Sequence, residues 1–232
     1  MTERPDPHGW ILDLAGKVPP LHWAEVFGFE PQGIEIEVGS GKGLFLRQQA
    51  AASPETGFLG VERAGKWLRL SAERVARDGR MNIRLIRADA FDLLARWAPA
   101  GSVTAIHVYF PDPWPKKRHA KRRLLGRSLF DLSARALGPG GILAIATDVL
   151  PYFEEARATL AAHLCFEETP VTEQGRESVR TNYAIKYERE GRGFRLAFFR
   201  RNSSAPPPIP PPPTRRSLRD GSAPPLAQGD AP

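Results

Sequence analysis

The sequence of 232 residues has very little cysteine and no long apolar run. Its single cysteine, Cys165, excludes an internal disulfide and any zinc site built on several cysteines. No apolar run approaches the roughly 20 residues that a membrane-spanning helix needs. The N-terminal residues MTERPDPHGW lack the apolar core of a signal peptide. We therefore expect a cytoplasmic protein with no membrane segment and no bound metal.

Basic residues exceed acidic residues in this chain. There are 33 lysines and arginines against 26 acidic residues, so the formal net charge is +7 and the pI is about 9.9. A basic balance favours a polyanionic partner, with a membrane surface as the alternative, but it does not determine a fold. Apolar residues make up 41% of the chain, which is enough for a substantial core.

Composition divides the chain into three parts. Residues 1–30 are expected to form an N-terminal arm with a short helix over 21–27, and residues 31–201 to form one domain. Residues 202–232 are rich in proline and have almost nothing to bury, so we expect a disordered tail with polyproline II character. A solvated tail without a specific role is favoured over a docking ligand for an aromatic groove.

Short apolar runs alternate with helix-like stretches through the central domain. The expected strands are 34–38, 58–61, 83–86, 103–110, 141–146, 164–168 and 194–199, and the expected helices are 43–52, 66–77, 91–97, 124–137 and 151–163. Strands alternating with helices of this length are typical of βαβ units. The pattern predicts an α/β fold with a mostly parallel, seven-stranded sheet and helices on both faces.

An acidic residue lies at or just after the end of each of the first five expected strands. These residues are Glu37, Glu62, Asp89, Asp112 and Asp148. Because parallel strands end at the same edge of a sheet, where ligands of α/β proteins bind, we expect the five carboxylates to line one crevice. The alternative is that each acid caps the helix that follows it, since aspartate is a favoured N-cap residue.

The first strand leads into a glycine-rich turn with Gly39, Gly41 and Gly43. Glycines with this spacing let the backbone turn tightly and approach a ligand. Glu62 follows Gly41 by 21 positions, near the spacing expected for an acid that binds ribose hydroxyls. The third glycine comes one residue too early for the dinucleotide motif, and the P-loop motif is incomplete. S-adenosylmethionine, which has a ribose, a cationic sulfonium and no phosphate, fits this turn better than NAD or ATP.

After the fourth expected strand, residues 109–123 form a rigid segment that we call the basic loop. It reads YFPDPWPKKRHAKRR, and six of the eight residues from Lys116 to Arg123 are lysine or arginine. The three prolines around Asp112 and Trp114 restrict the backbone. A run of charges is usually a solvated face, but here it begins four residues past an expected active-site carboxylate. We therefore expect contacts to the phosphates of a nucleic acid.

The residues from about Trp23 to Arg200 resemble the tRNA (guanine-N7-)-methyltransferases, a family of class I S-adenosylmethionine-dependent methyltransferases. The resemblance rests on HWAEVFG, EVGSGKG, FLGVER, RADAFDLL, PDPWPKKRHAKRR, ATD and TNYAIKYEREGRG. It implies a Rossmann-like methyltransferase domain over 31–201 and transfer of a methyl group to N7 of guanine 46 in the variable loop of tRNA. It also implies S-adenosyl-L-methionine as cofactor and tRNA as partner.

The resemblance assigns roles to single residues. It implies cofactor contacts from Glu37, Gly39, Glu62, Asp89 and Asp112, and a catalytic role for Asp112. It implies substrate contacts from Lys116, Asp148, Thr181, Asn182, Tyr183 and Ala184. The family usually has glutamate where this chain has Ala184, so one contact to cofactor or guanine is expected to differ.

Two alternatives stay open at this point. One is the same cofactor with another acceptor, and the other is a non-catalytic RNA-binding homologue. A monomer and a homodimer are both compatible with the sequence. For a methyltransferase, Trp114 and Tyr183 are candidates for stacking on a guanine that leaves its tertiary stack, although packing within the loop is an equal possibility for both.

Overall fold

A computed structural model describes residues 6–114, 118, 122–172, 175 and 179–208. Lys116 and the tail beyond Pro208 therefore lie outside the described residues. The helices are η1 (Pro7–Trp10), α1 (Trp23–Phe27), α2 (Leu44–Ala52), α3 (Gly65–Asp78), α4 (Ala90–Asp92), the π-helical turn η2 (Leu93–Trp97), α5 (Arg127–Ala136), α6 (Leu150–Ala161) and α8 (Asn182–Arg189). We find no helix within these ranges with the length and apolar character that crossing a membrane requires.

Seven strands form one sheet in the order β3-β2-β1-β4-β5-β7-β6. They are β1 (Gly33–Val38), β2 (Thr56–Val61), β3 (Ile83–Ile86), β4 (Val103–Tyr109), β5 (Leu137–Thr147), β6 (Phe166–Thr169) and β7 (Arg195–Arg201). Strands β1 to β5 pair in parallel, whereas β7 runs antiparallel to both β5 and β6. The predicted fold class, a mostly parallel α/β sheet, is confirmed.

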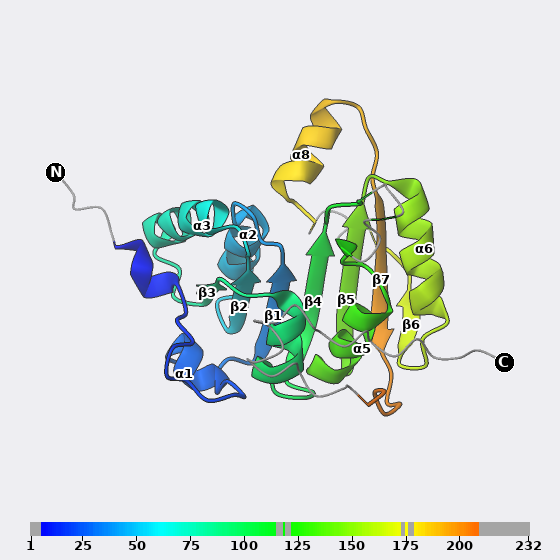
Figure 1. The fold of residues 1–232 in the computed structure, drawn as a ribbon. Helices are drawn as coiled ribbons and strands as arrows, with labels where there is room; N and C mark the ends of the chain where they lie inside the picture. Colours follow the sequence, from blue (N-terminus) through cyan, green and yellow to red (C-terminus); the bar gives the residue numbers. More distant parts are fainter. Residues whose placement is uncertain (1–5, 115–117, 119–121, 173–174, 176–178, 209–232) are drawn as a thin grey trace.

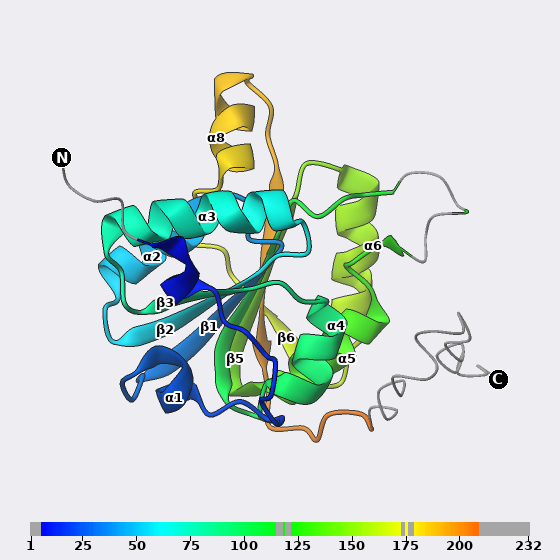
Figure 2. The same cartoon turned by 60° about the vertical axis from the view of Figure 1, so that its left-hand side comes forward.

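Helices cover both faces of this sheet (Figures 1 and 2). Helices α2 and α3 pack on one face, where Phe45 and Phe58 are fully buried. Helices α5 and α6 pack on the other, around Phe130 and Phe199. Burial of these aromatic side chains supplies much of the hydrophobic stabilisation, since each removes roughly 150–250 Å² from water. The two layers hold the parallel strands in register and fix the edge where they end.

Two sequence expectations were wrong in detail. The helix expected over 124–137 begins only at Arg127 and ends at Ala136, and Leu137 already belongs to β5. The strand expected over 141–146 begins earlier, at Leu137, because Leu137 already pairs with Val103 of β4. The glycine-rich segment that follows Leu137 shifts the register between the two strands. A Cβ on Gly138 would lie 2.9 Å from the carbonyl oxygen of Gly101, so this close pairing requires glycine.

Helix α8 was not expected at all. It follows Thr181 and stands above the ends of β4 and β5 in Figure 1, clear of the two helical layers. Its first three residues, with the N-cap residue Thr181, are the segment 181–184 that the family resemblance assigned to the substrate.

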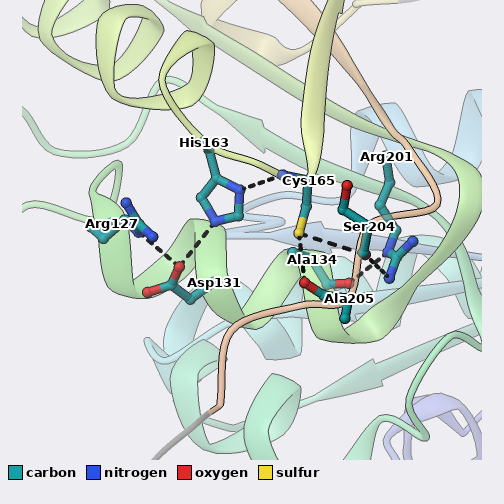
Figure 3. Close-up of polar contacts among 8 residues, drawn as sticks. All are labelled: Arg127, Asp131, Ala134, His163, Cys165, Arg201, Ser204 and Ala205. Atoms are coloured by element: carbon teal, nitrogen blue, oxygen red, sulfur yellow. Dashed lines mark hydrogen bonds and ion pairs between the residues drawn. The ribbon is translucent and has the colours of Figure 1, made fainter.

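The chain remains attached to the domain just past β7 (Figure 3). The backbone N–H of Asn202 donates to the carbonyl of Cys165 over 2.9 Å, and Arg201 Nε donates to the carbonyl of Ala134 over 2.8 Å. The buried Cys165 thiol lies 3.4 Å from the carbonyl oxygen of Ala205. His163 Nδ1 accepts from the Cys165 backbone N–H over 3.1 Å, so this nitrogen is not a base for the thiol. The cluster is structural, and it fixes where the proline-rich tail leaves the domain.

Candidate active site

The ends of five parallel strands form one edge of the sheet, which we call the carboxyl edge. Following the strand order, the acids along it are Asp89, Glu62, Glu37, Asp112 and Asp148. All five acids lie at this edge, as the parallel strands require, whereas the expectation that they line one crevice stays a prediction. Their burial and hydrogen-bond partners differ, however.

Glu62 holds the glycine-rich turn in place. Its Oε2 accepts from the backbone N–H of Gly41 over 3.0 Å, and its Oε1 accepts from the backbone N–H of Ala64 over 2.7 Å. Gly39, Gly41 and Gly43 have φ angles of 78°, 52° and 70°, a region that strongly favours glycine. The turn therefore depends on both the glycines and the acid from the next strand. An ionised carboxylate has about four lone-pair sites, so Glu62 keeps capacity for a ligand.

Glu37 is the most buried of the five acids. It lies within β1, and only 4% of its surface is exposed. Its Oε2 has no hydrogen-bond partner among the described residues. Burial, and secondly the negative charge of Glu62, raise the pKa of the Glu37 carboxyl well above its usual value. A buried carboxylate oxygen without a partner is costly for a folded protein, and it is suited to a cationic or hydrogen-bonding ligand.

Three polar side chains on the same face of the sheet as Glu37 contact one another, and the sequence did not predict these contacts. Glu35 Oε2 lies 2.9 Å from His107 Nε2, and His107 Nδ1 lies 2.9 Å from the hydroxyl of Tyr109. Both ring nitrogens of His107 thus lie within hydrogen-bond distance of a side-chain oxygen. Burial, then the charges of Glu37 and Glu35, raise the pKa of Tyr109 well above its usual value. Alternation along β1 and β4 puts these groups on one face, but only tertiary pairing brings them together.

Asp89 caps a helix, as the alternative interpretation of the strand-end acids predicted. It is the N-cap residue of α4 and accepts from the backbone N–H of Phe91 over 2.9 Å. Arg63 also lies 3.6 Å from its other oxygen, and 45% of the Asp89 side chain is exposed. Capping leaves part of the carboxylate open toward the edge.

The backbone around Asp112 is strained on both sides. Phe110 has a φ angle of 52° and Trp114 a φ angle of 41°, and among the described residues only these two non-glycine residues have positive φ. Each such residue costs about 1–2 kcal/mol. Outliers of this kind cluster at functional sites, where the surroundings hold them. They place Asp112 on an exposed turn at the carboxyl edge.

Two arginines of the basic loop hold this turn. Arg123 Nε donates to the carbonyl of Pro113 over 3.2 Å, and its Nη1 pairs with Glu155 over 2.7 Å. The guanidinium of Arg122 lies 4.9 Å from the centre of the Trp114 ring. The expectation that all six cations serve RNA phosphates therefore needs correction for Arg123, whose charge is already paired within the domain.

Asp148 anchors the chain that follows α8. It pairs with Arg192 Nη2 over 2.7 Å, and only 17% of its side chain is exposed. The Arg192 guanidinium also lies 4.3 Å from the centre of the Tyr187 ring. Burial, and next the neighbouring Asp148, raise the pKa of Tyr187. Sequence reasoning missed both partners of Asp148, since nothing in their spacing indicates contact with β5.

Four of the six residues assigned to the substrate lie at the start of helix α8. Thr181 is its N-cap residue, and its hydroxyl oxygen accepts from the backbone N–H of Ala184 over 3.0 Å. Ala184 is buried, and it occupies the third helical position, where glutamate completes a capping box. Asn182 lines a hollow on the helix with Lys186. Tyr183 is 54% exposed, which leaves much of its ring accessible.

Aromatic rings connect α8 to the strained turn. The ring centre of Phe110 lies 5.9 Å from that of Tyr183, 5.5 Å from that of Tyr187 and 5.3 Å from that of Phe194. The strained backbone of Phe110 is thus stabilised by ring packing worth about 0.5–1.5 kcal/mol per pair. Along the carboxyl edge, Asp112, Asp148 and the α8 residues therefore lie on the side of β4 and β5, and the glycine turn, Glu62 and Asp89 lie on the side of β1 to β3.

Comparisons with known proteins match most of the domain. A family model described as a putative methyltransferase matches residues 31–197. A tRNA (guanine-N(7)-)-methyltransferase of Nitrosococcus oceani is 38% identical over 174 residues, which cover 75% of this chain and 73% of that protein. The protein of the same name from Agrobacterium fabrum is 36% identical over 196 residues, covering 82% and 84%. One from Rhodopirellula baltica is 39% identical over 178 residues, covering 73% and 65%.

Solved structures of methyltransferases share the fold. The 16S rRNA methyltransferase KamB superimposes with a TM-score of 0.57 at 19% identity, covering 82% of this chain and 97% of that one. The 16S rRNA (adenine(1408)-N(1))-methyltransferase from Catenulisporales acidiphilia gives a TM-score of 0.53 at 20% identity, with the same coverage. At such identity the likeness concerns the fold alone.

Proposed function

Because the chain belongs to the tRNA (guanine-N7)-methyltransferase family, we propose that it methylates N7 of a guanine in tRNA, with guanine 46 of the variable loop as its target. S-adenosylmethionine is the proposed methyl donor, and the cytoplasm the proposed compartment. The observation that carries the proposal is the arrangement at the carboxyl edge. There a glycine turn fixed by Glu62 and the buried carboxylate of Glu37 lie next to the strained turn of Asp112.

The residues at this edge fit the proposed cofactor. Glu37 has a buried oxygen without a partner among the described residues, which suits a ligand with a cationic or hydroxyl group. A Cβ on Gly39 would meet nothing within 4 Å, so the backbone there is open to a close approach. Glu37, Gly39, Glu62, Asp89 and Asp112 would hold S-adenosylmethionine. When bound, it supplies an electrophilic methyl group on a cationic sulfur.

The task of the protein is to orient the guanine rather than to remove a proton. Guanine N7 carries a lone pair and is unprotonated at neutral pH, so it attacks without a general base. Holding a reactant in the right geometry is worth up to about 7–11 kcal/mol of a barrier. In this proposal Asp112 accepts hydrogen bonds from N1 and N2 of the guanine. Its negative charge also stabilises the positive charge that develops on the purine ring.

Substrate contacts are assigned to the opposite side of the crevice. Asp148 and the α8 residues Thr181, Asn182, Tyr183 and Ala184 would position the base, together with Lys116 of the basic loop. The exposed ring of Tyr183 supports a stacking role. The guanidinium of Arg122 lies over the ring of Trp114, the second candidate for stacking on the guanine.

Product analysis tests the proposed function directly. The protein is incubated with isotopically labelled S-adenosylmethionine and unmodified tRNA, and the labelled nucleotide is mapped. We expect 7-methylguanosine at position 46, and no label in a transcript with adenosine there. Label on another base, or no transfer, would overturn the assignment.

The basic loop has its own test. Neutralising the other five cations of the loop while keeping Arg123, which is paired with Glu155, should weaken tRNA binding and flatten its dependence on salt. The substitutions are Lys116→Ala, Lys117→Ala, Arg118→Ala, Lys121→Ala and Arg122→Ala. An unchanged salt slope would show that this run is only a solvated face.

A further inference from the structure

The side chains of two lysines lie over the ring of one tryptophan beside the glycine-rich turn. Lys42 lies between Gly41 and Gly43, and Lys66 and Trp67 lie in the first turn of α3. The ammonium nitrogens of both lysines lie 5.2 Å from the centre of the Trp67 ring. We call these three residues the Trp67 patch.

The two ammonium groups have no acidic counterpart. Neither Lys42 nor Lys66 forms an ion pair with any residue in the described ranges. Glu62 accepts from the backbone N–H groups of Gly41, next to Lys42, and of Ala64, two residues before Lys66. Because both ammonium groups lie near one ring, they repel each other within about the screening length of 8–10 Å at physiological salt. An anion bound at the patch would relieve that repulsion.

The ring also restricts where the charges lie. A cation over tryptophan gains about 0.5–1 kcal/mol at an exposed site, which favours one position of a flexible lysine stem. A side chain that is already ordered loses less entropy when it binds a partner. The patch therefore combines two positive charges that have no ion-pair partner in the described ranges with side chains that are already partly ordered. Both features favour binding of a phosphate group.

The patch lies at the carboxyl edge beside β1 and β2, whereas the described residues 109–114 of the basic loop follow β4. The turn after β1 carries Lys42, and the turn after β2 leads into Lys66 and Trp67. The strand order β2-β1-β4 places Glu62 and Glu37 toward the patch and the basic loop on the side of β4. Figure 2 shows α2 and α3 on the near side of this edge and α8 rising above it. An RNA strand with one base in the crevice has to continue on both sides of it.

We propose that the Trp67 patch binds the phosphate backbone of the RNA substrate on the side of the crevice opposite the basic loop. This inference rests on the proposed function, because it takes tRNA as the polyanion. It adds a second backbone contact, which together with the basic loop would fix the direction of the RNA strand across the site. Phosphate contacts fix register and orientation rather than sequence.

Salt-dependent binding of unmodified tRNA tests the inference. The double variant K42A/K66A should bind on the order of tenfold more weakly near 0.15 M salt, and its log–log salt slope should fall by about 1.5, the share of two phosphate contacts. The matched control R69A/R77A removes two exposed charges from the outer face of α3 and should leave the slope unchanged. Trp67→Leu keeps both charges and should weaken binding about threefold through lost ordering.

Two further measurements keep the result interpretable. Calorimetry with S-adenosylhomocysteine checks that the glycine turn of K42A/K66A still binds ligand. If Lys42→Ala disturbs the turn, the single variant K66A, on the helix surface, still tests the inference and should show half of the change in salt slope. A wild-type slope in K42A/K66A and K66A would overturn the inference, as would an equal loss in R69A/R77A. Mapping the product base with the wild-type protein separately tests the proposed function, so the two failures are distinguishable.

Discussion

Glu37→Gln isolates the charge of the most buried acid at the crevice. The substitution keeps the shape of the side chain and removes its ionisable group. In the structure Glu37 is 4% exposed and its Oε2 has no partner among the described residues. Burial and the charge of Glu62 raise the pKa of the carboxyl, so the folded protein holds a proton there more strongly than the unfolded chain does.

The sign of the stability change follows from that direction. Between the unfolded and the folded pKa the folded state binds more protons, so the free energy of unfolding falls as pH rises through this window and stays lower above it. Glutamine has no such loss. An unsatisfied buried polar group costs about 1–3 kcal/mol, and more when charged. For a domain of this size each kcal/mol changes the Tm by about 2–4 °C. Without ligand, Glu37→Gln should therefore raise the Tm at pH 7.5 by at least about 2 °C, and by much less at pH 4.

Ligand binding should change in the opposite direction. If Glu37 pairs with a cationic or hydroxyl group of the cofactor, glutamine loses a charge-assisted hydrogen bond of about 1.5–3 kcal/mol, or about 10- to 150-fold in Kd. Thermal unfolding at two pH values and calorimetry with S-adenosylmethionine measure both effects. Glu35→Gln, two residues earlier on β1 and paired with His107, is the control that should leave cofactor affinity unchanged. Wild-type affinity in Glu37→Gln, or an equal Tm difference at pH 4, would refute the reasoning.

Three other substitutions test separate parts of the structure. Asp112→Ala should lower single-turnover methyl transfer by about 100-fold or more while tRNA binding persists; near-normal turnover removes Asp112 from the mechanism. Thr181→Ala deletes the cap that accepts from Ala184 and should cost α8 about 1 kcal/mol; hydrogen exchange at the Ala184 amide measures it, and unchanged protection contradicts it. Gly60→Ala puts a Cβ 2.5 Å from a methyl group of Leu46 and should destabilise the domain by about 1–3 kcal/mol in urea unfolding; a loss below about 0.5 kcal/mol would mean that the core adjusts.

Much of the fold could be predicted because its signals are local. Each of the strands β1 to β4 is a short apolar run with an acid at or just after its end, and the spacing of its glycines identifies the glycine turn. Once the strands are taken as parallel, a shared edge for the five carboxylates follows from geometry. The resemblance to a methyltransferase family added roles for single residues, and the family is confirmed by relatives that cover most of the chain.

The sequence by itself thus determined the fold class, the order of the acids along the chain and the basic character of the loop after β4. Only the tertiary structure decided which charges are available. It paired Arg123 with Glu155 and Asp148 with Arg192, and it left an oxygen of Glu37 without a partner in the described part of the chain. The reason is physical: periodicity and spacing record local preferences, whereas the partner of a charge depends on which distant segments pack against it.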